Sequence, residues 1–119
     1  VEQLALDAKQ GRFVCTLAEC EGKAVGMALH HPRYSTWKGT TWYLEDLVVT
    51  QPWRGRGVGK ALMQVVVKRA LVEDAHRLEW QVLDWNKEAI GFYKALGASI
   101  SSDWLNGRLT RENLLNTEA

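Results

Sequence analysis

The chain has 119 residues and a hydrophobic content of 46%, which suits one globular domain with a substantial core. Fifteen basic residues against 14 acidic ones give a formal net charge of +1, so non-specific nucleic-acid binding is not expected. Six tryptophans and only two prolines argue against a disordered chain. The sequence shows no charged leader and no long apolar run, and we expect neither a signal peptide nor a membrane span.

The first half of the chain predicts strands. Apolar residues at helical offsets before Gly11 indicate the end of an amphipathic helix. After it, the residue types favour a strand at 12–20, a hairpin turn at 21–23, a strand at 24–29, a loop at 31–36, and a third and longest strand at 41–50.

The two cysteines, Cys15 and Cys20, lie in the first of these strands. Their odd offset points them to opposite faces and separates them by about 17 Å, so they cannot form a disulfide with each other. Unpaired cysteines favour a cytoplasmic location. The three histidines show no metal-ligand spacing, and no CxxC or HExxH motif occurs, so we expect no metal.

The second half predicts a crossover unit followed by helices. The expected elements are a glycine-rich turn at 53–59, a helix at 60–75, a strand at 76–84, a helix from Asn86 with Gly97 as its stop, one or two short strands within 99–109, and a helix at 110–115 capped by Thr110. Polar residues at every fourth position of the 60–75 helix predict one narrow exposed face, with the rest buried. A strand, turn, helix and strand in this order join parallel strands.

The glycine-rich turn carries the clearest chemical signal. Glycines alternate through 55–59, where the backbone must turn sharply or approach another group closely. Free N–H groups from Gly57 onward, with the helix dipole behind them, form a phosphate cradle. A Walker A loop is excluded by Arg54 and the dinucleotide fingerprint by Lys60, each standing where a glycine is required. The glycines alone equally allow a turn that only lets the helix pack on the sheet.

The segment Arg54-x-x-Gly57-x-Gly59, placed between a strand and a long helix, resembles the acetyl-coenzyme A signature of the GNAT superfamily of N-acetyltransferases, Gln/Arg-x-x-Gly-x-Gly/Ala. Three further segments, 43–49, 84–86 and 90–98, are similar to the diamine branch, the spermidine/spermine and thialysine acetyltransferases. The resemblance covers roughly 13–115. At the front, the chain departs from those enzymes, which begin with an additional strand and a pair of helices that wall part of the acceptor pocket.

The resemblance implies a fold and an activity. The fold is a mixed α/β sheet of the GNAT acyl-CoA N-acyltransferase type, in a single domain over 1–119 that is short at its N-terminus. The activity is acetyl transfer from acetyl-coenzyme A, as co-substrate, to a small primary amine by direct attack in a ternary complex. The resemblance also implies a homodimer, and we expect the aromatic residues Trp37 and Trp104 to contribute contacts to it. Two alternatives stay open: a non-catalytic acyl-CoA-binding module and a protein or peptide N-acetyltransferase.

The resemblance also implies roles for individual residues. Tyr93 is the general acid, and Glu45 binds the acceptor and handles its proton; Asp84 is a weaker acceptor-binding candidate. Cofactor-binding residues are Leu47, Val48, Val49, Arg54, Gly55, Arg56, Gly57, Val58, Gly59, Lys60 and Asn86. Without the resemblance, Tyr93 is read as core packing and Glu45 as half of a solvated acidic pair. Strand alternation predicts that Glu45 and Asp46 point to opposite faces, so that only one of them can face a given pocket.

Overall fold

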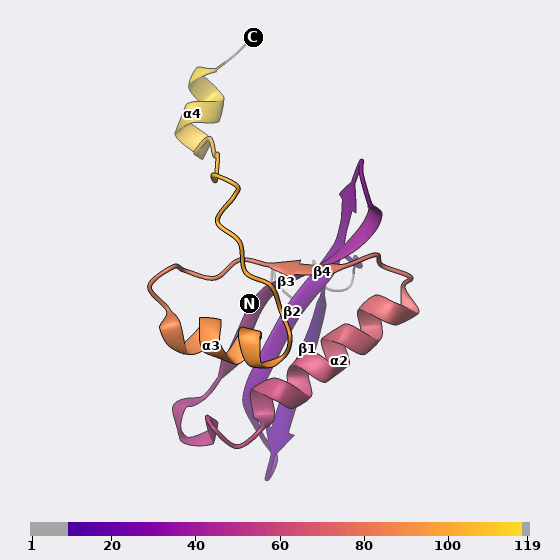
Figure 1. Ribbon diagram of the computed structural model, residues 1–119, viewed down its shortest axis with the longest axis vertical. Coiled ribbons are helices and arrows are strands. Elements are labelled where there is room, and N and C mark those ends of the chain that lie inside the picture. The colour runs from indigo at the N-terminus through magenta and orange to yellow at the C-terminus, as the bar shows by residue number, and fades with distance from the viewer. Residues whose placement is uncertain (1–9, 118–119) are drawn as a thin grey trace. The chain divides into compact units, whose positions relative to one another are not determined.

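The computed structural model describes residues 10–117. The chain divides into two compact units, of which the first ends at Gln81 and the second begins at Val82. The first unit contains β1 (Val14–Cys20), β2 (Lys23–Ser35), β3 (Gly39–Val49), the 3-10 helix η1 (Gln51–Trp53), α2 (Val58–Val72) and β4 (Leu78–Trp80), and the second contains α3 (Lys87–Ala95) and α4 (Arg111–Asn116) (Figure 1). The helix predicted before Gly11 falls outside the described residues.

The strands of the first unit form one sheet in the order β1-β2-β3-β4. The first three are antiparallel, whereas β4 runs parallel to β3, which confirms the predicted crossover through α2. The β1–β2 turn has positive φ at Glu21 (53°) and Gly22 (77°), the conformation that matches the twist of the flanking strands. Cys15 and Cys20 are both free, as predicted.

The prediction of a loop at 31–36 is wrong, because β2 continues to Ser35. Pairing between β1 and β2 ends at Val14 and His30, and beyond it β2 pairs only with β3. Pro32 lies in this part, where a residue without an N–H is tolerated because one edge of the strand is unpaired. The strand predicted at 76–84 is shorter than expected, because β4 has only three residues, Leu78–Trp80.

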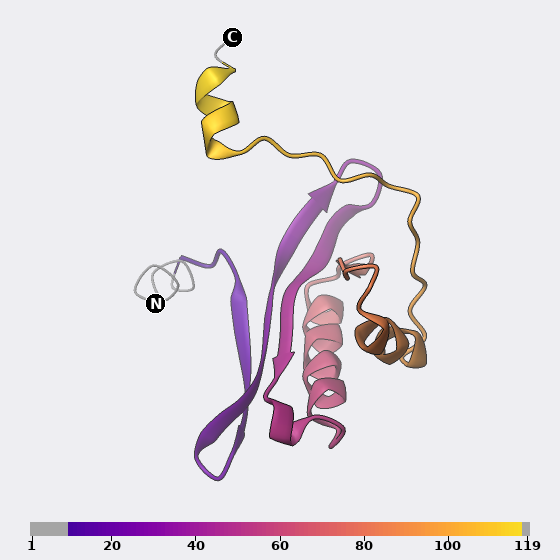
Figure 2. The same cartoon turned by 90° about the vertical axis from the view of Figure 1, so that its left-hand side faces the viewer.

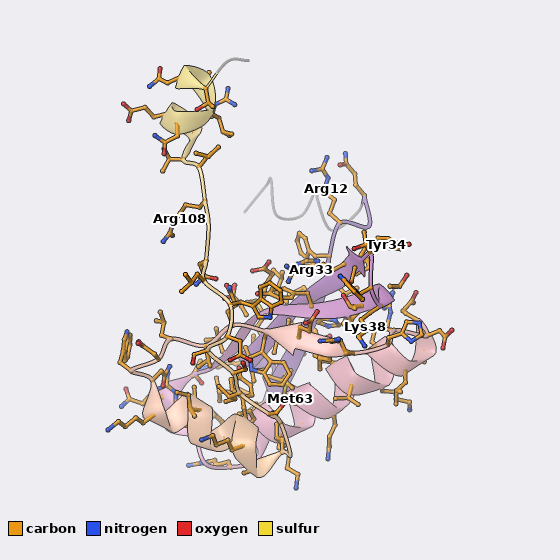
Figure 3. The ribbon with its side chains drawn as sticks, turned by 45° about the horizontal axis from the view of Figure 1, so that its top comes forward. Arg12, Arg33, Tyr34, Lys38, Met63 and Arg108 are labelled. Carbon is orange, nitrogen blue, oxygen red and sulfur yellow. The ribbon has the colours of Figure 1, made fainter. Side chains whose placement is uncertain are left out.

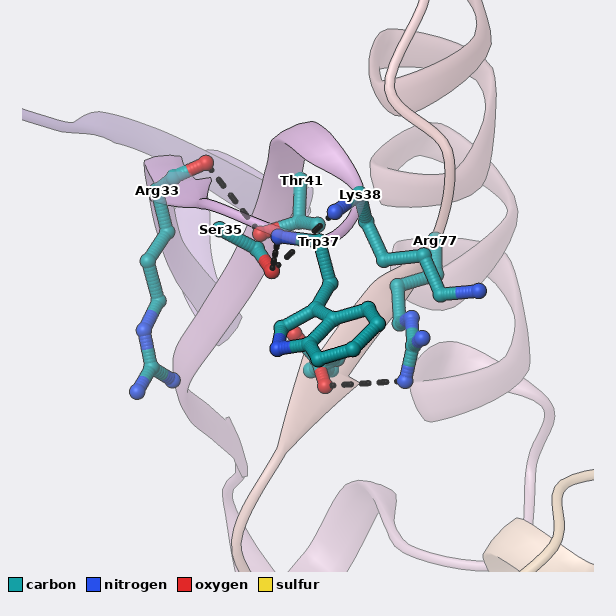
Figure 4. A network of polar contacts seen from close by, with 7 residues as sticks. Arg33, Ser35, Trp37, Lys38, Thr41 and Arg77 are labelled. Carbon is teal, nitrogen blue, oxygen red and sulfur yellow. Dashed lines mark hydrogen bonds and ion pairs between the residues drawn. The ribbon is translucent and has the colours of Figure 1, made fainter.

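The far end of the β2–β3 hairpin is held by side chains. Thr41 Oγ1 donates to the Arg33 carbonyl at 3.1 Å, and Ser35 Oγ accepts from the backbone N–H groups of Trp37 and Lys38 at 3.2 Å each (Figure 4). Figure 3 shows Arg33, Tyr34 and Lys38 at this end of the hairpin. Exposed tips of this kind depend on such local bonds, because little apolar surface is buried there.

Helix α2 lies along one face of the sheet (Figure 2). Its buried residues are Leu62, Met63, Val66 and Ala70, which pack on the side of Ala28, Trp42 and Leu44. The prediction of one narrow exposed face is wrong, because Val65, Val67, Leu71 and Val72 are also exposed. A helix against a single sheet buries only the stripe that faces it. None of the described helices combines the length and apolarity needed to cross a membrane.

Gly26 allows the start of α2 to approach the sheet closely. A Cβ at this position would lie 3.0 Å from both Leu62 Cδ1 and Val58 Cγ1, and 3.2 Å from the Val48 carbonyl oxygen. At these distances a side chain could be placed only if its neighbours moved by a few tenths of an ångström. Because side chains alternate along a strand, Ala28 and His30 share the α2 face with Gly26, whereas His31 points to the opposite face.

His30 is a buried polar residue with both ring nitrogens bonded. Trp42 Nε1, which can only donate, lies 2.8 Å from His30 Nδ1. The Nδ1 atom therefore accepts, and Nε2 carries the hydrogen and donates to Thr16 Oγ1 at 3.0 Å. Burial lowers the pKa of His30, and the positive charge of Arg69 lowers it further. The ring is thus held neutral inside the core.

The second unit confirms the predicted helix caps. Asn86 Oδ1 accepts from the Ala89 N–H at 3.1 Å at the start of α3. At its end Gly97 has φ 93°, and the N–H of Ala98 reaches the Tyr93 carbonyl at 3.2 Å, a Schellman ending.

Thr110 caps α4, as predicted, and the structure adds a reciprocal bond from the Asn113 side chain, which completes a capping box. The strands predicted within 99–109 are absent from the described residues, and this segment is exposed. A strand needs a neighbour to satisfy its backbone, and the described sheet ends at β4.

Candidate functional site

The turn between η1 and α2 has the left-handed backbone that its glycines predict. Gly55 has φ 74° and Gly57 φ 87°, a region that costs other residues roughly 1–2 kcal/mol. A Cβ at either position would meet nothing within 4 Å. The glycines are therefore required by the backbone conformation, and the outer side of the turn is open.

The N-terminus of α2 presents N–H groups at this turn. The first intrahelical bond runs from Ala61 N to the Gly57 carbonyl at 3.0 Å, so the N–H groups of 58–60 have no acceptor within the helix. No side chain caps this end, and its first turn contains no acidic residue. Lys60 and Arg56 are exposed beside it. Together, the N–H groups without a helical acceptor, the positive end of the helix dipole and the two cations favour binding of an anion at this turn.

Two arginines of the turn also have structural contacts. Arg54 Nε donates to the Val49 carbonyl at 2.9 Å, which ties the turn to the end of β3. The Arg56 guanidinium lies 5.0 Å from the centre of the Trp53 ring, within the range of a cation–π contact.

Strand β3 contains a bulge at Glu45. His30 pairs with Leu44 and Leu29 with Asp46, so Glu45 is the extra residue, without a partner on β2. Asp46 therefore lies on the same face of the sheet as Leu29 and His31. Glu45 lies on this face as well, because its side chain contacts His31. The prediction that the two acidic residues point to opposite faces is wrong, because the bulge interrupts the alternation.

The bulge coincides with the end of the β3–β4 ladder. This ladder has three pairs and ends at Leu44 and Trp80, while β3 continues through Leu47 to Val49 along β2. The strands thus stop pairing where the bulge begins, just before Leu47. Backbone polar groups on the β4 side of this segment therefore lie beyond the ladder.

A histidine that the sequence analysis did not select lies against Glu45. His31 Nε2 is 3.1 Å from Glu45 Oε1, and the two side chains are 24% and 52% exposed. The Tyr43 ring is tilted by 40° against the imidazole, at 5.6 Å between centres. Burial raises the pKa of Tyr43, and the Glu45 charge raises it further. His31 was missed because the predicted loop began at this residue.

The remaining candidates belong to the second unit. Tyr93 is buried in α3 with 8% exposure, and its ring meets Phe92 edge-on at 5.3 Å. Burial raises the pKa of the Tyr93 phenol above its ordinary value of 10.0, at which a phenol is already protonated at neutral pH. Asn86 caps α3, and Asp84 is exposed before it. Within the first unit, Glu45 and residues 47–49 belong to the same strand, β3, and Arg54 ties the turn to the end of that strand at Val49.

A sequence profile described as the acetyltransferase (GNAT) family matches residues 2–98. The chain belongs to the GNAT family. The GNAT chain is 47% identical over 74 residues to a thialysine N-epsilon-acetyltransferase of Bos taurus, covering 62% of this chain and 44% of that protein. It is 38% identical over 90 residues to an L-ornithine N5-acetyltransferase of Arabidopsis thaliana, covering 75% and 40%. These matches, with one to a human spermidine/spermine acetyltransferase-like protein, confirm the resemblance to the diamine branch.

The GNAT chain spans about half the length of the curated relatives it matches, for example 54% of the mouse thialysine enzyme. Among solved structures, an integron cassette protein from the V. cholerae mobile metagenome superposes with a TM-score of 0.82 at 25% identity, covering 98% of this chain and 76% of that one. An aminoglycoside N-acetyltransferase in complex with CoA gives 0.78 at 20% identity, covering 92% and 87%. The mixed α/β GNAT fold is thereby confirmed.

Proposed function

We propose that this protein is an acetyl-coenzyme A-dependent N-acetyltransferase that acts on a small primary amine by direct attack in a ternary complex, with both units in one domain. The observation that carries the proposal is the junction of β3 and α2. A separated strand, a left-handed glycine turn and an uncapped helix N-terminus follow one another there within 47–60.

Residues of this junction would bind the parts of coenzyme A. The N–H groups of 58–60 would bind the pyrophosphate, and the cations of Arg56 and Lys60 would lie beside it. Backbone groups of 47–49 on the β4 side would hold the pantetheine arm, with the Asn86 side chain as a further ligand. When bound, acetyl-coenzyme A supplies an activated acetyl thioester.

Two side chains would manage the protons. An aliphatic ammonium has a pKa of about 10.4 and must lose a proton before it can attack, and the exposed carboxylate of Glu45 can accept it. Asp84 would help to attract the cationic acceptor. The Tyr93 phenol, which is protonated at neutral pH, would donate a proton to the departing thiolate. Oriented N–H groups beside the strand would stabilise the developing oxyanion.

The choice of acceptor follows the relatives. The matched relatives are named for transfer to the side-chain amines of thialysine and ornithine, and aminoglycoside acetyltransferases are among the structural neighbours. We therefore propose an amine of the diamine or amino-acid type. We also propose a homodimer, to which the exposed Trp37 and Trp104 would contribute contacts.

Calorimetry with acetyl-coenzyme A, followed by a thiol-release assay over polyamines, ornithine, thialysine, aminoglycosides and N-terminal peptides, tests the proposal. Binding with release for a small amine supports it. Binding without release for any acceptor would instead identify a non-catalytic module, and release for peptides alone a peptide acetyltransferase. Glu45→Gln should lower kcat by about 10²-fold, whereas Asp46→Asn, the matched control on the same face, should stay close to wild type.

A further inference from the structure

The contact between His31 and Glu45 joins two strands at the bulge. His31 belongs to the regular β2–β3 ladder, whereas Glu45 is the residue that the ladder leaves out. The Glu45 carboxylate is the more exposed of the two groups, and its Oε1 lies 3.1 Å from His31 Nε2. A proton taken up by Glu45 thus has the imidazole as its next acceptor.

The second ring nitrogen fixes where hydrogen must lie. His31 Nδ1 is 2.9 Å from the Pro32 carbonyl oxygen, which can only accept, so Nδ1 carries a hydrogen. The other nitrogen faces a carboxylate, which also only accepts when ionised. The contact between Nε2 and Oε1 is a hydrogen bond only when the pair holds one further proton. The geometry is therefore that of a site for one exchangeable proton shared by two groups.

Charged groups of three strands surround the pair. On β2, the buried His30 points to the opposite face of the sheet from His31. The Arg33 guanidinium, also on β2, lies 4.7 Å from the centre of the Tyr43 ring. On β3, the Tyr43 ring is tilted against the imidazole, and Asp46 lies on the same face as the pair. On β4, Glu79 acts on Tyr43 and is paired with Arg77 at 3.5 Å. Arg33 and Glu79 thus flank the Tyr43 ring with opposite charges.

We propose that His31 is the proton relay of Glu45: it takes the proton that Glu45 removes from the acceptor ammonium and passes it to solvent. This inference rests on the proposed function and adds a residue to it. His31 acts through Glu45 and is a positioning and relay residue.

The relay moves one proton from the acceptor ammonium through Glu45 and His31 to water. One N–H bond of the ammonium breaks, and its electron pair stays on the amine nitrogen, which becomes the nucleophile. The proton moves to Glu45 Oε1 and then to His31 Nε2, so the carboxylate is regenerated and the neutral imidazole becomes imidazolium. The imidazolium keeps its Nδ1 hydrogen on the Pro32 carbonyl. It releases the Nε2 proton to a water that reaches the 24% exposed side chain when the contact between Nε2 and Oε1 opens. The catalytically ready form is the one in which the pair has lost its shared proton, so activity should rise with pH.

The test compares thiol release from acetyl-coenzyme A, with thialysine and with L-ornithine, in the wild type, His31→Ala and His31→Gln across the neutral pH range. His31→Ala should lower kcat about tenfold or more, shift the acidic limb of the pH profile, and recover activity when imidazole is added. His31→Gln keeps an N–H donor toward Glu45 but cannot carry a proton. It should bind acetyl-coenzyme A normally and stay impaired. His76→Ala, an exposed histidine outside the pair, is the control.

Each outcome has a separate meaning. A wild type that acetylates no amine overturns the proposed function. An active wild type with an equally active His31→Ala overturns the relay alone. A loss in His31→Ala that imidazole does not restore, with an unchanged pH profile, marks a structural role and also overturns the relay. Full activity in His31→Gln would do the same, since a fixed hydrogen-bond donor would then suffice.

Discussion

Replacing His30 with phenylalanine should destabilise the protein most at alkaline pH and least at acidic pH. The substitution removes His30 Nδ1, which accepts the hydrogen bond from Trp42 Nε1. Trp42 is only 3% exposed, so its N–H cannot turn to water instead. A buried donor left without a partner costs about 1–3 kcal/mol. The Thr16 hydroxyl, which is partly exposed, can turn to water and adds little. We therefore expect His30→Phe to lose about 1–3 kcal/mol of unfolding free energy at about pH 8.

The pH dependence follows from the lowered pKa of His30. In the unfolded chain the ring binds a proton below its ordinary pKa of 6.5, whereas the folded chain resists it. The stabilisation due to neutral His30 is therefore complete above 6.5 and is lost as pH falls from there through the lowered folded value. Each unit of lowering corresponds to about 1.4 kcal/mol. The phenylalanine variant lacks this loss, so the two stabilities should converge on acidification.

Urea unfolding followed by far-UV circular dichroism at about pH 8 and about pH 5 measures both free energies. His76→Gln, which changes an exposed histidine, serves as the control and should follow the wild type at both values. A deficit of the same size at both pH values would refute the reasoning, because it would mean that His30 is protonated equally in the folded and unfolded chains. No deficit at the higher pH would refute the hydrogen-bond argument.

Two further predictions concern the turn and the second unit. Gly57→Ala should weaken acetyl-coenzyme A binding in calorimetry and lower the unfolding free energy by about 1–2 kcal/mol, because alanine is strained at φ 87° although its Cβ has open space. The control Gly91→Ala, at an open helical position, should instead stabilise the protein. An equal loss of stability in both variants would contradict the backbone argument. Asn86→Ala should remove the α3 cap at a cost of about 1 kcal/mol, seen as faster amide exchange of Ala89, and unchanged exchange there would contradict it.

Local chemistry made several elements predictable from the sequence. The caps of Asn86 and Thr110 and the positive φ at Gly97 depend on neighbouring residues only. The glycines of the 53–59 turn are likewise explained by their own backbone angles. Features of this kind were predicted correctly because no distant contact is needed to form them.

The missed features depend on distant partners. Whether β2 passes through Pro32 depends on where β1 stops pairing, and the composition of 31–36 alone does not contain that information. The exposure of Leu71 and Val72 depends on how many layers cover α2. The bulge at Glu45 is a matter of register between two strands, so neither the shared face of the acidic residues nor the contact with His31 could be derived from spacing.

The bulge makes Glu45 an insertion in the sheet. Leaving this one residue out would put Leu44 and Asp46 next to each other opposite His30 and Leu29, and the β2–β3 ladder would run without interruption. A shortened strand of that kind keeps every cross-strand pair and loses only the carboxylate. The fold could therefore survive the deletion that removes the proposed proton acceptor, and chains of this architecture that lack the extra residue would retain the sheet without this chemistry.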